Sequence, residues 1–160
     1  MIIFDASTLI LLAKIDILQT VLHKYSGIIP EFVKEEVTYK KDIDTELIVQ
    51  QIKDGNLVIE KNPKKDKTSQ FLKDFPLGRG EAAALIIAKE KNIILATDDG
   101  LAIKVCKIFG IGFTTAIHFL IELGLDESLA MAKLQLLKKF GRYSSDIIKD
   151  AEERIRKGKK

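Results

Sequence analysis

Short runs of apolar residues alternate along the chain with longer stretches in which apolar residues recur at helical spacing. The short runs predict buried strands at 2–4, 28–29, 57–59, 93–96 and 111–113. Alternation of strands and helices is typical of βαβ units, which build a parallel sheet covered by helices on both faces. We therefore expect an α/β fold, a three-layer α/β/α domain around a central, mainly parallel sheet of about five short strands.

The stretches between the runs predict helices. In 7–25 the residues Leu11, Ile15, Leu18 and Leu22 form the stripe of one amphipathic helix, which Gly27 ends. Further helices are expected at 30–39, 45–54, 68–75, 80–91, 99–109 and 115–123. The lysine-rich segment 61–67 is predicted to be a loop.

Two amphipathic helices, about 127–140 and 145–157, complete the chain. We expect residues 1–125 to form the α/β domain and residues 126–160 a helical extension packed on it. The apolar stripe of the extension is wide and needs a cover. Either the body of the domain or another chain, a second protomer or a regulatory helix, would provide that cover.

Composition excludes several classes of protein. The longest apolar run, 82–88, has seven residues, whereas a membrane-spanning helix needs about 20. Asp5 interrupts the apolar N-terminus, so we expect no signal peptide, no membrane segment and a cytoplasmic protein. Cys106 is the single cysteine, which excludes an intramolecular disulfide and a cysteine-built zinc site. Since the only histidines are His23 and His118, any metal must be held by oxygen.

Charge is divided unevenly along the chain. Residues 1–132 carry a net charge of −3, and residues 133–160 carry +6. A basic tail on a mildly acidic body indicates an anionic partner such as nucleic acid, for which Lys157, Lys159 and Lys160 are the candidate contacts. A solvated terminal helix is the alternative explanation of the same charges.

Acidic residues follow two of the predicted strands directly. Asp5 comes after the first strand, and Asp98 and Asp99 come after the strand at 93–96. A lone Asp at such a place often only caps the next helix. Because parallel strands bring their carboxyl ends to one edge of a sheet, we expect these acids to lie close together.

Two more acids are expected to join them from helices. Glu81 opens an alanine-rich, almost wholly apolar helix that would hold it against the sheet rather than in water. In the helix after Pro30, Glu36 lies beside the apolar Val33 and Val37 and is preferred over the other glutamates.

Converging carboxylates need a cation. Two charges about 4 Å apart repel by roughly 4 kcal/mol at an effective dielectric constant near 20, so four would be badly destabilising without neutralisation. Oxygen ligands without His or Cys select Mg²⁺ or Mn²⁺, and such sites usually serve phosphoryl chemistry. The set is typical of a metal-dependent nuclease or phosphatase. Arg79, in a Gly-Arg-Gly turn, is a candidate phosphate contact, although it also suits a surface turn.

The order of these residues resembles the PIN-domain nucleases, including the VapC-type toxins. The motifs that carry the resemblance are Asp5-Ala6-Ser7-Thr8-Leu9-Ile10, Glu36, Gly80-Glu81-Ala82 and Thr97-Asp98-Asp99, and the likeness covers about residues 1–123. Many members carry Asp where this chain has Glu81. The resemblance implies cleavage of RNA with Mg²⁺ or Mn²⁺, often by a homodimer and often under the control of a small antitoxin.

The resemblance also implies roles for single residues. The four acids that would act in catalysis are Asp5, Glu36, Glu81 and Asp99, and the metal ligands would come from Asp5, Glu81, Asp98 and Asp99. Whether Asp98 or Asp99 is the main ligand, and whether one or two ions bind, stays open. Ser7 and Thr97 would orient the acids by hydrogen bonds, or would act only as caps and turn residues.

Three hypotheses follow. The first is a divalent-metal-dependent endoribonuclease of PIN type, which could be the toxin of a toxin–antitoxin pair. The second is a catalytically weak PIN-like module that binds RNA or a protein. The third, phosphatase chemistry on another doubly wound fold, needs an Asp two residues after the nucleophilic Asp, and Ser7 occupies that position.

Overall fold

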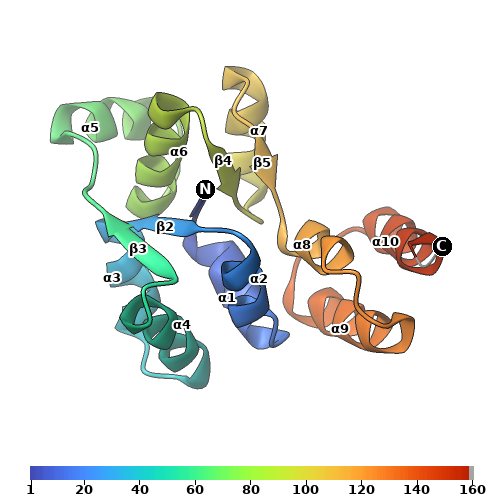
Figure 1. Cartoon of the computed structure of the whole chain (residues 1–160). Coiled ribbons are helices and arrows are strands. Elements are labelled where there is room, and N and C mark those ends of the chain that lie inside the picture. The colour runs from blue at the N-terminus through green and yellow to red at the C-terminus, as the bar shows by residue number, and fades with distance from the viewer. Residues whose placement is uncertain (159–160) are drawn as a thin grey trace.

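The computed structural model describes residues 1–158, and its centre is a five-stranded sheet (Figure 1). The strands are β1 (Ile2–Phe4), β2 (Gly27–Pro30), β3 (Leu57–Glu60), β4 (Ile94–Ala96) and β5 (Phe113–Thr114). Their order in the sheet is β3-β2-β1-β4-β5, and all four neighbouring pairs are parallel. The predicted parallel sheet is confirmed, with β1 in its middle.

Helices cover both faces of this sheet. They are α1 (Ala6–Lys14), α2 (Leu18–Lys24), α3 (Glu31–Tyr39), α4 (Ile43–Lys53), α5 (Lys65–Asp74), α6 (Arg79–Lys91), α7 (Gly100–Phe109), α8 (Ala116–Glu122), α9 (Glu127–Phe140) and α10 (Ser145–Lys157). In Figure 1, α5, α6 and α7 lie on one side of the sheet, and α1, α2, α8, α9 and α10 lie on the other.

The alternation of side chains along β1 explains the two layers. Ile2 and Phe4 belong to the core shared with α1, α2, α8 and α9, whereas Ile3 belongs to the core shared with α6 and α7. Successive residues of a strand point to opposite faces, so three residues are enough to serve both cores. The three-layer α/β/α architecture expected from the sequence is therefore confirmed.

The single helix predicted over 7–25 was wrong. The chain forms α1 and α2, with Asp16 between them in the left-handed region at φ 58° and an angle of 119° between the two axes. A straight helix of that length would span about 28 Å, whereas strands of three or four residues span only about 10–13 Å. The break folds the apolar stripe back on the sheet, and all four predicted stripe residues are buried.

Two other boundaries differ from the prediction. The last strand is Phe113–Thr114 rather than 111–113, because Gly110 ends α7 in a left-handed conformation and Ile111 turns into the core before the strand begins. Helix α5 begins at Lys65, inside the segment predicted as a loop.

The two C-terminal helices share the core of the body. Ala130, Leu134 and Leu137 of α9 and Ile148, Ala151 and Ile155 of α10 belong to the same buried cluster as α1 and α8. Three other apolar residues of α9, Leu129, Leu136 and Phe140, remain between 38% and 47% exposed. Only the inner half of the predicted stripe is therefore covered by the body.

Within residues 1–158, no single helix combines the length and the apolar composition that a membrane span needs. The bent pair α1–α2 reaches that composition and length only when its two helices are taken together.

Candidate functional site

The carboxyl ends of β1 and β4 bring the first candidate residues together. Phe4 and Ala96 are register partners, and the backbone N–H of Asp5 donates to the carbonyl of Ala96 at 3.0 Å. The residues that follow the two strands therefore share one edge of the sheet. This edge is where parallel α/β sheets usually place their chemistry.

Asp5 is the innermost of these acids, with 1% of its surface exposed. Its Oδ1 accepts hydrogen bonds from the Ser7 hydroxyl at 2.7 Å and from the backbone N–H of Thr8 at 3.2 Å, and its Oδ2 accepts one from the Thr97 hydroxyl. Burial raises the pKa of Asp5 to about 7 in spite of these donors. Ser7 and Thr97 thus orient this carboxyl, and Asp5 also caps α1.

Asp99 caps the neighbouring helix. Its Oδ2 accepts a hydrogen bond from the backbone N–H of Ala102 at 2.8 Å, and its own N–H donates to the Thr97 hydroxyl oxygen at 3.2 Å. Thr97 is buried, donates to Asp5 and accepts from Asp99. A single hydroxyl therefore connects the two acids that follow β1 and β4.

Glu81 lies within the electrostatic reach of three other carboxylates. Burial, together with the charges of Asp99, Asp5 and Glu36 in that order, raises the pKa of Glu81 to about 7. Within residues 1–158, no Lys or Arg side chain forms an ion pair with any of these four acids. The structure thus brings Asp5, Glu36, Glu81 and Asp99 into one electrostatic group with uncompensated negative charge.

Glu36 lies at the rim of this group, next to Gly80, which has no side chain to displace the Glu36 carboxylate. A Cβ atom on Gly80 would lie 2.9 Å from Oε2 of Glu36 and 3.1 Å from Cγ2 of Val33. With any larger residue at position 80, the Glu36 carboxylate would have to move away from the beginning of α6. Partial burial of the Glu36 carboxyl raises its pKa above the ordinary value of a glutamate. The preference for Glu36 agrees with its place beside Glu81.

Asp98 has different surroundings. Its carboxylate accepts hydrogen bonds from the Thr8 hydroxyl at 2.6 Å, from the backbone N–H of Ala116 at 3.0 Å and from the Tyr143 hydroxyl. Its own N–H donates to Ser7 Oγ at 3.0 Å. Asp98 is therefore engaged by α1, α8 and the C-terminal segment, and it is not among the charges that act on Glu81.

Tyr143 is a residue of this site that the sequence reasoning missed. Its hydroxyl reaches Asp98 from 45 residues away in the sequence, and both burial and the nearby carboxylate raise the tyrosine pKa. A Cβ atom on Gly141 would meet the Tyr143 ring at 2.6 Å, so a glycine is needed where the ring folds back over the chain. The available signal was the Gly-Arg-Tyr-Ser segment between the last two helices.

The predicted nucleic-acid contacts are dispersed. The Arg79 guanidinium lies over the Phe32 ring, 4.7 Å from its centroid, at the rim beside Glu36. Lys157 is exposed in the last turn of α10. Lys159 and Lys160 lie outside the described residues.

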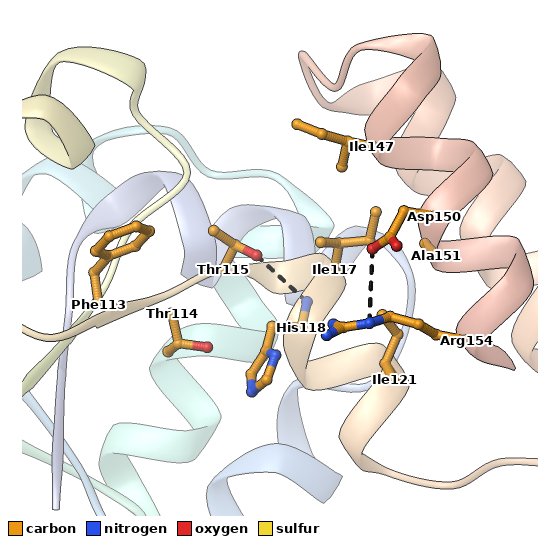
Figure 2. A pocket seen from close by; sticks show the side chains of 10 residues that line it. All are labelled: Phe113, Thr114, Thr115, Ile117, His118, Ile121, Ile147, Asp150, Ala151 and Arg154. Atoms are coloured by element: carbon orange, nitrogen blue, oxygen red, sulfur yellow. Dashed lines mark hydrogen bonds and ion pairs between the residues drawn. The ribbon is translucent and has the colours of Figure 1, made fainter. Parts of the chain in front are cut away.

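A hollow of about 260 Å³ lies between α8 and α10, and none of the candidate acids lines it (Figure 2). Its one carboxylate, Asp150, pairs with Arg154 of the same helix at 3.6 Å. The other walls include Ile117, Ile121 and Ile147. Because its single carboxylate is already paired, this hollow lacks the group of acids that marks the candidate active site at the ends of β1 and β4.

The acidic group suits a hard divalent cation by its chemistry. All its donors are carboxylate oxygens, and cationic side chains do not neutralise them in the part of the chain described. As the side chains lie, no three His, Cys, Asp or Glu groups of residues 1–158 already enclose a position for an ion. Binding would therefore require carboxylates to turn inward.

Comparison with known families agrees with this picture. A family model, DUF3368, described as a PIN domain, matches residues 1–155. The chain belongs to the PIN-domain family. No curated protein matches it.

The PIN-domain match extends through the two C-terminal helices as well as the sheet. PIN domains are generally nucleases and typically use divalent metals. In this PIN domain, the candidate acids gather at the edge formed by β1 and β4, which is the edge predicted from the sequence.

Proposed function

We propose that this PIN domain is a divalent-metal-dependent endoribonuclease. One observation carries the proposal: Glu81 lies within the electrostatic reach of Asp99, Asp5 and Glu36, and no cationic side chain of residues 1–158 pairs with these acids. Such an arrangement costs folding free energy, because like charges repel in a partly buried site. A cation that brings a phosphodiester to the site would offset this cost.

In this proposal Asp5 and Asp99 hold an Mg²⁺ or Mn²⁺ ion. Glu81 and Glu36 hold a second ion or position the attacking water. The ion supplies positive charge that polarises the phosphodiester and makes water more acidic. We assign the ligand role to Asp99 rather than Asp98, because Asp99 is among the charges that act on Glu81 and Asp98 is not.

The surrounding residues keep the acids in place. Ser7 and Thr97 fix Asp5 from two sides, which limits the rotation of its carboxyl. Gly80 lets Glu36 approach the beginning of α6. The protein thus contributes orientation and negative charge, while Arg79 at the rim offers a phosphate contact.

Cleavage of a labelled single-stranded RNA with and without Mg²⁺ or Mn²⁺ tests the proposal. We expect Asp5→Asn and Glu81→Gln each to lower the metal-dependent rate by about 100-fold or more, since each removes a charge on which cation binding depends. Glu153→Gln, on the exposed side of α10, is the matched control and should cleave like the wild type. Equal rates in Asp5→Asn and Glu153→Gln would remove Asp5 from the site.

The alternative is a catalytically weak module that binds RNA or a protein. Calorimetry with Mn²⁺ separates the two proposals, because the nuclease requires binding that Glu81→Gln weakens. An absence of Mn²⁺ binding at millimolar concentration favours the module. The proposed role as a toxin needs a separate test, namely co-purification with a small protein encoded beside it.

A further inference from the structure

A hollow of about 500 Å³ adjoins the acidic group at its rim. It lies between the exposed side of α3 and the beginning of α6. The side chains that matter here are Phe32, Glu35, Glu36, Tyr39, Lys40 and Arg79. The hollow adjoins the proposed active site, because Glu36 and the beginning of α6, which carries Glu81, line it.

Tyr39 is unusually exposed for an aromatic residue. Of its surface, 86% is accessible, the largest fraction among the exposed large hydrophobic side chains of residues 1–158. Burial of an aromatic ring is normally favourable. The ring of Tyr39, at the last residue of α3, is therefore available to stack on a planar group that enters the hollow.

The two cations of the hollow are available to an anion. Arg79 lies over the Phe32 ring, and Lys40 is exposed just beyond the end of α3. Neither forms an ion pair with a carboxylate in the part of the chain described. An Arg that packs on an aromatic ring can still donate hydrogen bonds from its N–H groups to phosphate oxygens.

An accessible aromatic ring with adjacent unpaired cations is the combination that binds single-stranded nucleic acid. We infer that this hollow binds the nucleotides of single-stranded RNA next to the phosphodiester that is cleaved, with a base stacked on Tyr39 and the backbone phosphates at Arg79 and Lys40. Glu35 and Glu36 disfavour phosphate elsewhere in the hollow. The inference rests on the proposed function and names the path of its substrate.

Binding of a fluorescent ten-nucleotide RNA without divalent metal, measured by anisotropy, tests the inference separately from cleavage. Tyr39→Ala should weaken binding by about 5- to 150-fold and leave its salt dependence unchanged, whereas Tyr39→Phe should bind like the wild type. Arg79→Gln and Lys40→Gln should each reduce the slope of log K against log salt by about 0.7. Tyr39 is so exposed that its loss should not change the unfolding midpoint.

Matched controls come from the end of α7 farthest from Asp99. Ile108→Ala removes another large side chain that is 67% exposed, and Lys107→Gln removes another exposed lysine. Affinities equal to these controls in Tyr39→Ala, Arg79→Gln and Lys40→Gln would overturn the inference while cleavage could still confirm the nuclease. A DNA decamer that binds as tightly and loses as much in Tyr39→Ala would overturn the assignment to RNA.

Discussion

The hydroxyl of Tyr143 donates a hydrogen bond to Oδ1 of Asp98, and this contact joins the segment between α9 and α10 to the turn that carries Asp99. The backbone N–H of Ala116 and the Thr8 hydroxyl reach the same carboxylate. The C-terminal helices therefore help to hold the turn that contributes to the proposed active site.

Tyr143→Phe should destabilise the protein by about 1–3 kcal/mol, because the half-buried Asp98 carboxylate loses one of its donors. Urea unfolding measures this change. Tyr25→Phe is the matched control: its ring packs on Phe119, and it should unfold like the wild type. A Tyr143→Phe midpoint no lower than that of Tyr25→Phe would contradict a stabilising contact.

Gly80→Ala should impair the site more than the fold. The added Cβ would meet Oε2 of Glu36 at 2.9 Å, and the flexible glutamate can move away more readily than Val33 can. Alanine also favours the helix by up to about 1 kcal/mol, so the unfolding free energy should change by less than about 2 kcal/mol.

The measurement for Gly80→Ala compares RNA cleavage with urea unfolding. Gly78→Ala is its control, because a Cβ there would come no closer than 3.8 Å to Glu81. We expect at least a tenfold loss of rate in Gly80→Ala and little loss in Gly78→Ala. Similar rates in the two variants would show that the displacement of Glu36 does not matter.

The metal-free protein should become less stable as the pH rises from about 4 to above 7. Folding raises the pKa of Asp5 from 3.8 to about 7 and that of Glu81 from 4.5 to about 7. Between these values the folded state binds more protons than the unfolded state, so its stability is greatest below the unfolded pKa and falls as each acid ionises.

Urea unfolding in EDTA at pH 5 and pH 8 measures this dependence. Asp5→Asn should flatten it, since asparagine keeps the hydrogen-bonding shape without the charge. Mg²⁺ should restore stability mainly at pH 8, where the acids are ionised. Greater stability at pH 8 than at pH 5 without metal would be incompatible with these raised pKa values.

The lysines of the basic C-terminal tail should strengthen RNA binding through their charge, whatever the RNA sequence. Replacement of Lys157, Lys159 and Lys160 by Gln should weaken RNA binding at every sequence and reduce the salt slope by up to about 2. The control removes three exposed lysines elsewhere, Lys53, Lys104 and Lys107. An unchanged slope would mean that the tail is only solvated.

The convergence of the acids could be predicted because it follows from topology. Once 2–4 and 93–96 are parallel neighbours, Asp5 and Asp99 must share an edge, and helical periodicity places Glu36 beside the buried Val33 and Val37. The orientation of Asp98 could not be predicted. It depends on Tyr143, and no local pattern in the sequence states which distant hydroxyl meets which carboxylate.

The break between α1 and α2 was hidden for a related reason. Its apolar stripe is regular, and only the short strands of the finished sheet require the chain to turn back at Asp16. The role of Gly80 likewise depends on the distance between two helices that the sequence does not give.

The capping bonds of α1 and α7 have a consequence for observing the site in solution. The amide proton of Thr8 is bonded to Asp5, and that of Ala102 is bonded to Asp99. Each is one hydrogen bond away from an acid of the proposed active site. The chemical shifts of these two amides should therefore change when the acids are protonated and when a cation binds. The first turns of α1 and α7 thus allow the state of the proposed active site to be followed in solution.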